Sequence, residues 1–272
     1  SSLVDGSANA TLAQFLNATR VREESGKLLR PACIFKFGNV GDEASTEDFK
    51  MRLALDVVRA VQSGQLPPEA MGLTIRCSPK RGDCYVSIDL DAGGDAWNPD
   101  DDECVRLLED QADVLANEVS EFLRGQYTCF ANATGPFNAP VLGIRESWRW
   151  RGKYELGADD LIKAKPFTDV VALATWPIEL REDARGPKLI YFENNQPAHI
   201  PLRSLMSSDV EGVFFAGKCQ SASHEALASV RVMGTCFATG QAAGIAAALY
   251  AGGERQVETM AAMIRDQTSL DI

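Results

Sequence analysis

A wholly apolar run of four residues, Val-Phe-Phe-Ala at 213–216, most constrains how this chain can fold. Four hydrophobic residues in succession favour a strand that is buried on both faces, as in a parallel sheet covered by helices. The run ends at Gly217, where a ligand can approach the backbone closely. An Ala- and Gly-rich stretch at 235–250 then predicts a helix that packs tightly on its neighbours. The sequence therefore predicts a mixed α/β or α+β fold.

Helices and strands alternate along the rest of the chain. Phe49, Leu53, Val57 and Val61 recur at helical spacing, and Ser45 and Asp48 before them are placed like a capping box. A second helix, at 103–124, has the apolar stripe Cys104, Leu108, Leu115, Val119 and Phe122. Further helices are expected at 12–16 and 254–267. Strands are expected at 29–37, 73–76, 85–90, 137–144, 153–160, 170–176 and 186–192.

Composition limits the classes of function. The chain has 272 residues, of which 45% are hydrophobic and 24% are charged, as in soluble globular proteins. No apolar run approaches the length of a membrane-spanning helix, and no signal peptide is visible, so we expect a soluble, cytoplasmic protein. The net charge of -11 argues against a nucleic-acid partner, because phosphate binding needs clustered Lys and Arg. Because residue 1 is Ser, we also expect a truncated or processed chain.

Seven cysteines are present, and none forms a C-x-x-C pair. This spacing argues against a zinc or iron–sulfur site, and we expect no bound metal. Cys77 and Cys84 flank a predicted hairpin turn, a spacing that allows them to face each other across its two strands. In a cytoplasmic protein such thiols are expected to stay reduced.

A concentration of reactive side chains follows the apolar strand. His224, Glu225 and Arg231 lie in a stretch, 218–233, that we predict to be irregular, and functional groups are often placed on such segments. Gly234-Thr235-Cys236 then opens the Ala-rich helix, whose free N–H groups and positive dipole end suit a negatively polarised ligand atom. From the residues alone, a packed helix after a loop without function is an equally good interpretation.

The segment AGKCQSASHEALASVRVMGTCFATGQAAG, at 216–244, resembles the C-terminal signature of the FAD-dependent oxidoreductases with a glutathione-reductase-like flavin domain. That signature reads AGR-x-I-S-x-x-HEA-x-x-S-x-R-V-M-x-T-x-x-x-x-G-Q-A-A-G. GIRES at 143–147, IPLRSL at 200–205 and VDGSANATLA at 4–13 are similar to further family elements in the same order. The resemblance therefore covers essentially the whole chain. Lys218 replaces a family Arg, and Ala8 and Asn9 replace a frequent Gly and Asp.

The resemblance implies a partial FAD-binding domain of glutathione-reductase type with an inserted substrate, or cap, domain. We expect 1–30 and 200–252 to belong to the FAD-binding domain, 31–199 to the substrate domain, and 253–272 to a C-terminal helix. The family's G-x-G-x-x-G motif is absent from this chain. We therefore expect a missing N-terminal dinucleotide-binding region, in the same or a separate chain, without which this chain is inactive.

By the same resemblance, FAD is the cofactor and the reaction is a two-electron oxidation or reduction of a small organic substrate. Two segments would contact FAD. Gly217, Lys218 and Cys219 would lie at its ribityl–pyrophosphate region. Met233, Gly234, Thr235 and Cys236 would lie at the pyrimidine edge of its ring system. The alternative is a non-catalytic subunit or binding module that pairs with a separate dinucleotide-binding chain.

The resemblance assigns the catalytic roles to His224 and Arg231. His224 would exchange a proton with the substrate, and Arg231 would bind a carboxylate or stabilise developing negative charge. Arg145 and Glu146 either form a buried ion pair or approach the substrate. The second histidine of the chain, His199, is expected to be structural.

Overall fold

The computed structural model describes residues 1–78, 82–183 and 186–270. They form two compact units. Unit 1 comprises Ser1–Glu23, Glu146–Leu180 and Lys188–Ile272, and unit 2 comprises Glu24–Arg145 and Arg181–Pro187. Residues 146–180 and 188–199, which we expected in the domain over 31–199, thus pack with the terminal segments, because their strands lie against helices of unit 1.

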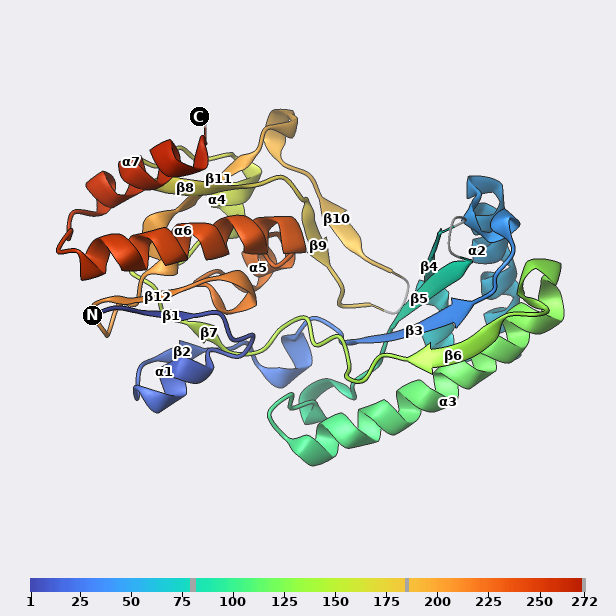
Figure 1. The fold of residues 1–272 in the computed structure, drawn as a ribbon. Coiled ribbons are helices and arrows are strands. Elements are labelled where there is room, and N and C mark those ends of the chain that lie inside the picture. The colour runs from blue at the N-terminus through green and yellow to red at the C-terminus, as the bar shows by residue number, and fades with distance from the viewer. Residues whose placement is uncertain (79–81, 184–185, 271–272) are drawn as a thin grey trace. The chain divides into compact units, whose positions relative to one another are not determined.

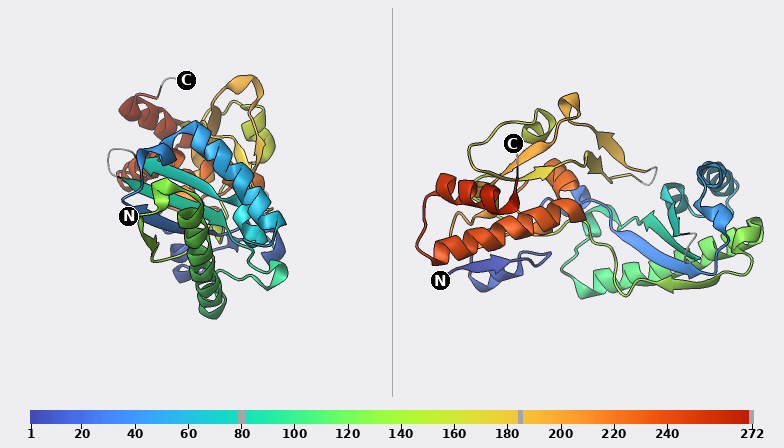
Figure 2. Two further views of the ribbon diagram at one scale, coloured as in Figure 1. Left: turned by 90° about the vertical axis from the view of Figure 1, so that its right-hand side faces the viewer. Right: turned by 45° about the horizontal axis from the view of Figure 1, so that its top comes forward.

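Unit 1 is built around helix α6, Met233–Ala251. On one side lies a parallel pair, β1 (Leu3–Asp5) with β12 (Val213–Phe215), and on the other an antiparallel pair, β8 (Val170–Ala174) with β11 (Ala198–Pro201) (Figures 1 and 2). Ala242, Ala243, Ala246 and Ala247 of α6 are buried, and their small side chains let its backbone approach both pairs. Helix α7, Val257–Thr268, packs beside α6. The predicted buried strand and the tightly packed helix are both confirmed.

The smaller elements of unit 1 surround this centre. They are α1 (Thr11–Phe15), β2 (Arg20–Val21) paired with β7 (Arg149–Trp150), α4 (Ala158–Ile162), β9 (Ile178–Leu180) paired with β10 (Lys188–Ile190), and α5 (His224–Val230), together with the 3-10 turns η6 (Glu193–Asn195), η7 (Leu202–Leu205) and η8 (Gly217–Cys219).

Two predictions for unit 1 are wrong. The strand expected at 153–160 is absent from the described structure, and α4 begins there instead, with the Gly157 N–H donating to Asp160 Oδ2 at 3.0 Å. The stretch at 218–233 is not irregular, since it contains α5. The hydroxyl of Ser223 caps α5 by accepting a hydrogen bond from the Ala226 N–H at 3.2 Å.

Unit 2 is a four-stranded antiparallel sheet with two long helices (Figure 1). The strand order is β4 (Thr74–Ser78), β5 (Asp83–Asp89), β3 (Ala32–Gly38), β6 (Thr134–Asn138). Helices α2 (Glu47–Gln62) and α3 (Asp102–Gln126) share one hydrophobic core with alternate residues of the strands, among them Phe35, Phe37, Val86 and Ile88. The 3-10 turns are η1 (Ser25–Lys27), η2 (Asp42–Ser45), η3 (Pro68–Gly72), η4 (Gly94–Ala96) and η5 (Thr128–Phe130).

The helical periodicity of unit 2 is confirmed, but its predicted cap is wrong. Phe49, Leu53 and Val57 are buried as expected, and Val61 is half-buried. The N-cap of α2 is Thr46, whose hydroxyl accepts from the Phe49 N–H at 3.2 Å, whereas the Ser45 hydroxyl donates to the Asp42 carbonyl. The cap of α2 is therefore one residue further along the chain than the sequence predicted.

Cys77 and Cys84 form a disulfide, which corrects the expectation of two reduced thiols. The two residues are directly opposed in the β4–β5 register, as the predicted hairpin requires. The intervening turn residues, 79–81, lie outside the described residues.

Replacing both cysteines by Ala is expected to destabilise unit 2 by about 2 kcal/mol, because the crosslink closes a short loop and restricts the unfolded chain. Thermal unfolding with and without reductant checks this. Reductant should lower the midpoint temperature of unfolding of the wild type but not that of the double variant. A wild-type transition that ignores reductant would contradict the prediction.

No single helix among the described residues has the length and apolar composition of a membrane span, and α5 and α6 reach them only when taken together across a bend of 95°.

Candidate functional site

The two segments that we predicted to contact a cofactor lie against each other. Gly217, at the start of η8, donates its N–H to the hydroxyl of Thr239 in α6 at 3.3 Å. Gly217 has a φ of +73°, which strains any residue with a side chain. A Cβ added there would lie 3.7 Å from Cys236 Sγ. The turn after β12 is therefore held against the first two turns of α6.

The N-terminal end of α6 is open within the described structure. Its N-cap, Val232, supplies no side-chain hydrogen bond there, and its first turn carries no acidic residue. A Cβ added at Gly234 would meet no described atom within 4 Å. The neighbouring Met233 is 78% exposed. The N–H groups and positive dipole end of this 19-residue helix can therefore receive a negatively polarised group.

The two cysteines near this end are not activated thiols. Cys219 is fully buried, with its Sγ donating to the Ala216 carbonyl at 3.3 Å, and burial raises its pKa to about 12. Burial also raises the pKa of Cys236, which the nearby Arg231 guanidinium partly offsets. Because thiolates are the reactive form of cysteine, neither thiol suits nucleophilic chemistry at neutral pH.

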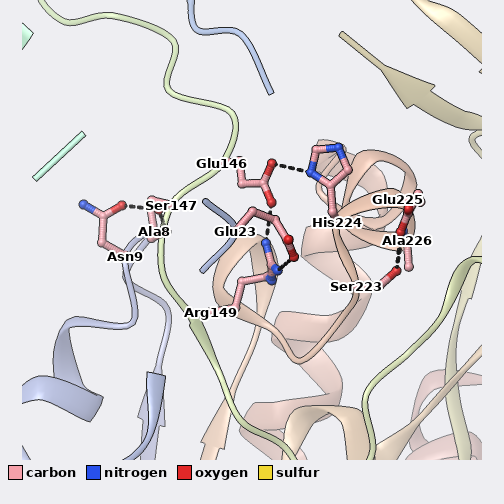
Figure 3. A network of polar contacts seen from close by, with 10 residues as sticks. All are labelled: Ala8, Asn9, Glu23, Glu146, Ser147, Arg149, Ser223, His224, Glu225 and Ala226. Atoms are coloured by element: carbon pink, nitrogen blue, oxygen red, sulfur yellow. Dashed lines mark hydrogen bonds and ion pairs between the residues drawn. The ribbon is translucent and has the colours of Figure 1, made fainter. Parts of the chain in front are cut away.

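A buried pair of titratable side chains, Glu146 and His224, comes from two distant parts of the sequence (Figure 3). Nδ1 of His224 lies 2.8 Å from Oε2 of Glu146. Glu146 is 0% and His224 9% exposed. His224 is the first residue of α5, and Figure 3 shows the second ring nitrogen pointing away from Glu146. This is the geometry of an imidazole that a buried carboxylate holds through one ring nitrogen.

Two further charged side chains extend the pair. Arg149 contacts the second carboxylate oxygen of Glu146 through Nη1. Its Nη2 donates to Oε1 of Glu23 at 3.0 Å (Figure 3). Arg149 is 2% exposed, whereas the Glu23 side chain is 35% exposed. The four side chains therefore form one chain of contacts that runs from a buried imidazole to a half-exposed carboxylate.

The segment that carries Glu146 is anchored on both sides. The Ser147 hydroxyl contacts Oδ1 of Asn9 at 2.7 Å and the Ala8 carbonyl at 3.1 Å, as Figure 3 shows. Trp150 donates its indole N–H to Oδ2 of Asp5 at 2.8 Å and stacks on Phe215. The backbone that carries Glu146 and Arg149 is thus held in place by contacts with Asp5 of β1 and Phe215 of β12.

In the described structure, Arg145 and Glu146 bind different partners. Arg145 binds Oδ1 of the buried Asp89 at 2.7 Å in unit 2, where Arg181 binds Oδ2 at 2.8 Å. The boundary between the units falls between Arg145 and Glu146. Of this predicted pair, the structure therefore brings only Glu146 to His224.

The other predicted residues have the following places. Lys218 is half-buried in η8, and Thr235 is buried in the first turn of α6. Arg231 is the C-cap of α5. His199 lies opposite Leu173 in the β11–β8 pair, where burial lowers its pKa. This position agrees with a structural histidine.

Sequence reasoning missed Arg149 and Glu23 as parts of the site. Arg149 lies three residues after Glu146, but β7 is too short to show a periodic pattern. Glu23 is 126 residues away from Arg149 in the chain, and no local signal points to it.

Groups of three or more His, Cys, Asp or Glu side chains placed to hold a metal ion do not occur in the described part of the chain.

Comparison with protein families gives one match. The family described as FAD dependent oxidoreductase matches residues 4–267. No curated protein and no solved structure matches the chain. The family match spans both units and includes the η8 turn, α5 and the start of α6. The chain therefore belongs to the FAD-dependent oxidoreductase family, whose cofactor is FAD.

Proposed function

We propose that this protein forms the flavin-facing and substrate-facing part of an oxidoreductase with a glutathione-reductase-like flavin domain, which catalyses a two-electron oxidation or reduction of a small organic substrate. One observation carries the proposal. The Gly217 turn and the open start of α6 lie in contact within unit 1 of a chain whose family uses FAD. The Glu146–His224 pair in the same unit supplies a proton-exchanging group.

The residues present fit FAD. A glycine of positive φ at 217 lets a ligand approach the backbone, and the space around Gly234 admits a ring at the helix end. The positive end of α6 suits the pyrimidine edge of the flavin, which carries negative charge in the reduced state. Gly217, Lys218 and Cys219 would hold the ribityl–pyrophosphate region, and Met233 to Cys236 the pyrimidine edge. FAD supplies the two-electron redox chemistry when it is bound.

The chain's own residues would bind the substrate and move its proton. His224 would take or return that proton at Nε2, because Nδ1 contacts Glu146. Arg231, seven residues further on, would hold a substrate carboxylate or offset developing negative charge, as a guanidinium does well. The buried setting of Glu146 and His224 limits the access of water to the proton that is exchanged.

A further region is expected to pack on unit 1. Among the described residues β1 pairs with β12 alone, although its Leu3 and Val4 are 49% and 43% exposed. A parallel pair of strands with apolar residues in water is not stable by itself. The exposed Met233 and Phe237 lie on the α6 surface of the same unit. We propose that a glycine-rich dinucleotide-binding region, from this or a separate chain, covers these residues and is needed for activity.

The same exposed surface also supports the alternative of a non-catalytic subunit that only pairs with a dinucleotide-binding chain. Replacement of His224 distinguishes the two. A catalytic role requires a loss of turnover in the assembled enzyme, whereas a purely structural subunit tolerates the change.

Flavin binding is tested at Gly234. The Gly234→Asp variant places a carboxylate where the negative edge of the flavin is proposed to lie, and we expect at least about tenfold weaker FAD binding. The same carboxylate should stabilise the start of α6 by about 0.5 kcal/mol, so the protein without FAD should not be less stable. FAD titration followed by flavin fluorescence, with thermal unfolding in parallel, measures both effects.

Gly234→Asn is the matched control, because it is nearly isosteric with Asp and uncharged, so it should bind FAD more tightly than the Asp variant. Equal affinity of the two variants would contradict the proposed position of the flavin. A protein produced from its complete gene that carries no flavin would contradict the proposed function itself.

A further inference from the structure

We infer that Glu146 is a positioning residue that keeps the proton of the neutral His224 ring on Nδ1, and that Arg149, held by Glu23, keeps Glu146 in the form that does so. The relevance of this to catalysis rests on the proposed function, whereas the tautomer itself does not.

The first step concerns the contact between the Glu146 carboxylate and the His224 ring. Glu146 Oε2 lies 2.8 Å from His224 Nδ1, a hydrogen-bond distance. An ionised carboxylate only accepts hydrogen bonds, so Nδ1 must carry the hydrogen in this contact. In a neutral imidazole the lone pair is then on Nε2. A second group thus decides which ring nitrogen can accept a proton.

The second step concerns the charge of Glu146. This carboxyl group is fully buried, and burial alone disfavours the ionised form. Arg149 contacts its other oxygen, Oε1, and a guanidinium keeps its charge in proteins. The opposite charge at contact distance favours the ionised carboxylate. Arg149 therefore supplies the positive charge that allows the buried Glu146 to stay ionised and to act only as a hydrogen-bond acceptor.

The third step concerns the orientation of Arg149. Its two terminal nitrogens bind different partners, Glu146 through Nη1 and Glu23 through Nη2 at 3.0 Å. The planar guanidinium is thus fixed between two carboxylates (Figure 3). These three groups carry one net negative charge, which a protonated His224 would neutralise.

Side-chain NMR of isotope-labelled histidine tests the inference on the purified protein. The chain has only two histidines, and His199→Gln assigns their signals. In the wild type we expect the neutral His224 ring to carry its hydrogen on Nδ1. In Glu146→Gln we expect the ratio of the two tautomers to shift by about tenfold or more towards hydrogen on Nε2, because a neutral amide replaces a charged acceptor.

Glu225→Gln is the matched control. It makes the same chemical change at the residue next to His224, on the same helix, where the exposed carboxylate accepts from the Ser223 hydroxyl at 3.1 Å. It should leave the tautomer ratio of His224 as in the wild type. A wild-type ring with hydrogen on Nε2, or an unchanged ratio in Glu146→Gln, overturns the inference.

Glu23→Gln keeps the test valid if the buried Glu146 variant does not fold, because Glu23 is half-exposed and its replacement leaves no buried space unfilled. We expect a shift in the same direction but smaller than about tenfold, since Glu23 acts only through Arg149. No shift in this variant overturns the role of the Arg149–Glu23 contact. The flavin content of each sample is measured separately, so that a failure of flavin binding is not mistaken for a failure of this inference.

Discussion

His224→Asn is expected to lower turnover by about 10²–10⁴-fold without loss of bound flavin. The ring is held by a fully buried carboxylate, and its Nε2 is the proposed site of proton exchange. Asn removes that site but keeps a short polar side chain at the first residue of α5. The rate at which substrate bleaches the flavin absorbance of the assembled enzyme measures the effect.

His199→Gln is the control for this experiment. It replaces the other histidine of the chain, which lies in the β11–β8 pair of the same unit. We expect it to change turnover by less than about threefold. Equal losses in both variants would indicate a general effect on unit 1, and no loss in His224→Asn would support the non-catalytic alternative.

Periodicity predicted the elements that have one apolar face. Phe49, Leu53 and Val57 recur every four residues because α2 covers one side of a sheet, and the pattern is therefore visible in the sequence. The four apolar residues at 213–216 mark a strand that is enclosed on both faces. Both arguments succeed because burial of these elements follows directly from local spacing.

Helix α5 was missed for the opposite reason. Ala226, Leu227, Ala228 and Val230 are all fully buried, so the helix has no polar face and its sequence has no helical period. The only sequence signal for α5 is its N-cap, Ser223, and a single Ser before a His does not distinguish a helix from a turn.

The contacts of the site depend on tertiary structure. The resemblance pointed to Glu146 and His224 separately, but they are 78 residues apart and their contact is set by the packing of unit 1. The ion pair of Arg145 with Asp89 shows the same limit, since adjacency in sequence suggested Glu146 as the partner. The tautomer of His224 depends on Arg149 and Glu23, which only the folded chain brings together.

Asp5→Ala is expected to lower the free energy of unfolding of unit 1 by about 3 kcal/mol or more. The Asp5 carboxylate is 3% exposed and accepts three hydrogen bonds. The donors are the N–H groups of Ser7 and Leu12, at 2.8 and 3.1 Å, and the indole N–H of Trp150 at 2.8 Å. Alanine removes all three acceptor contacts at once and leaves one buried indole N–H and two partly buried backbone N–H groups without their acceptor.

Denaturant unfolding measures this loss, and two variants define its origin. Asp5→Asn keeps one acceptor oxygen, so its free energy of unfolding should lie between those of the wild type and Asp5→Ala. Asp159→Ala removes an exposed carboxylate paired with Lys163 at 2.9 Å and should leave the midpoint unchanged. Because Trp150 adjoins Arg149 and stacks on Phe215, the Asp5 variants should also loosen the Glu146–Arg149 contact. A stable Asp5→Ala protein would show that β1 does not hold this segment in place.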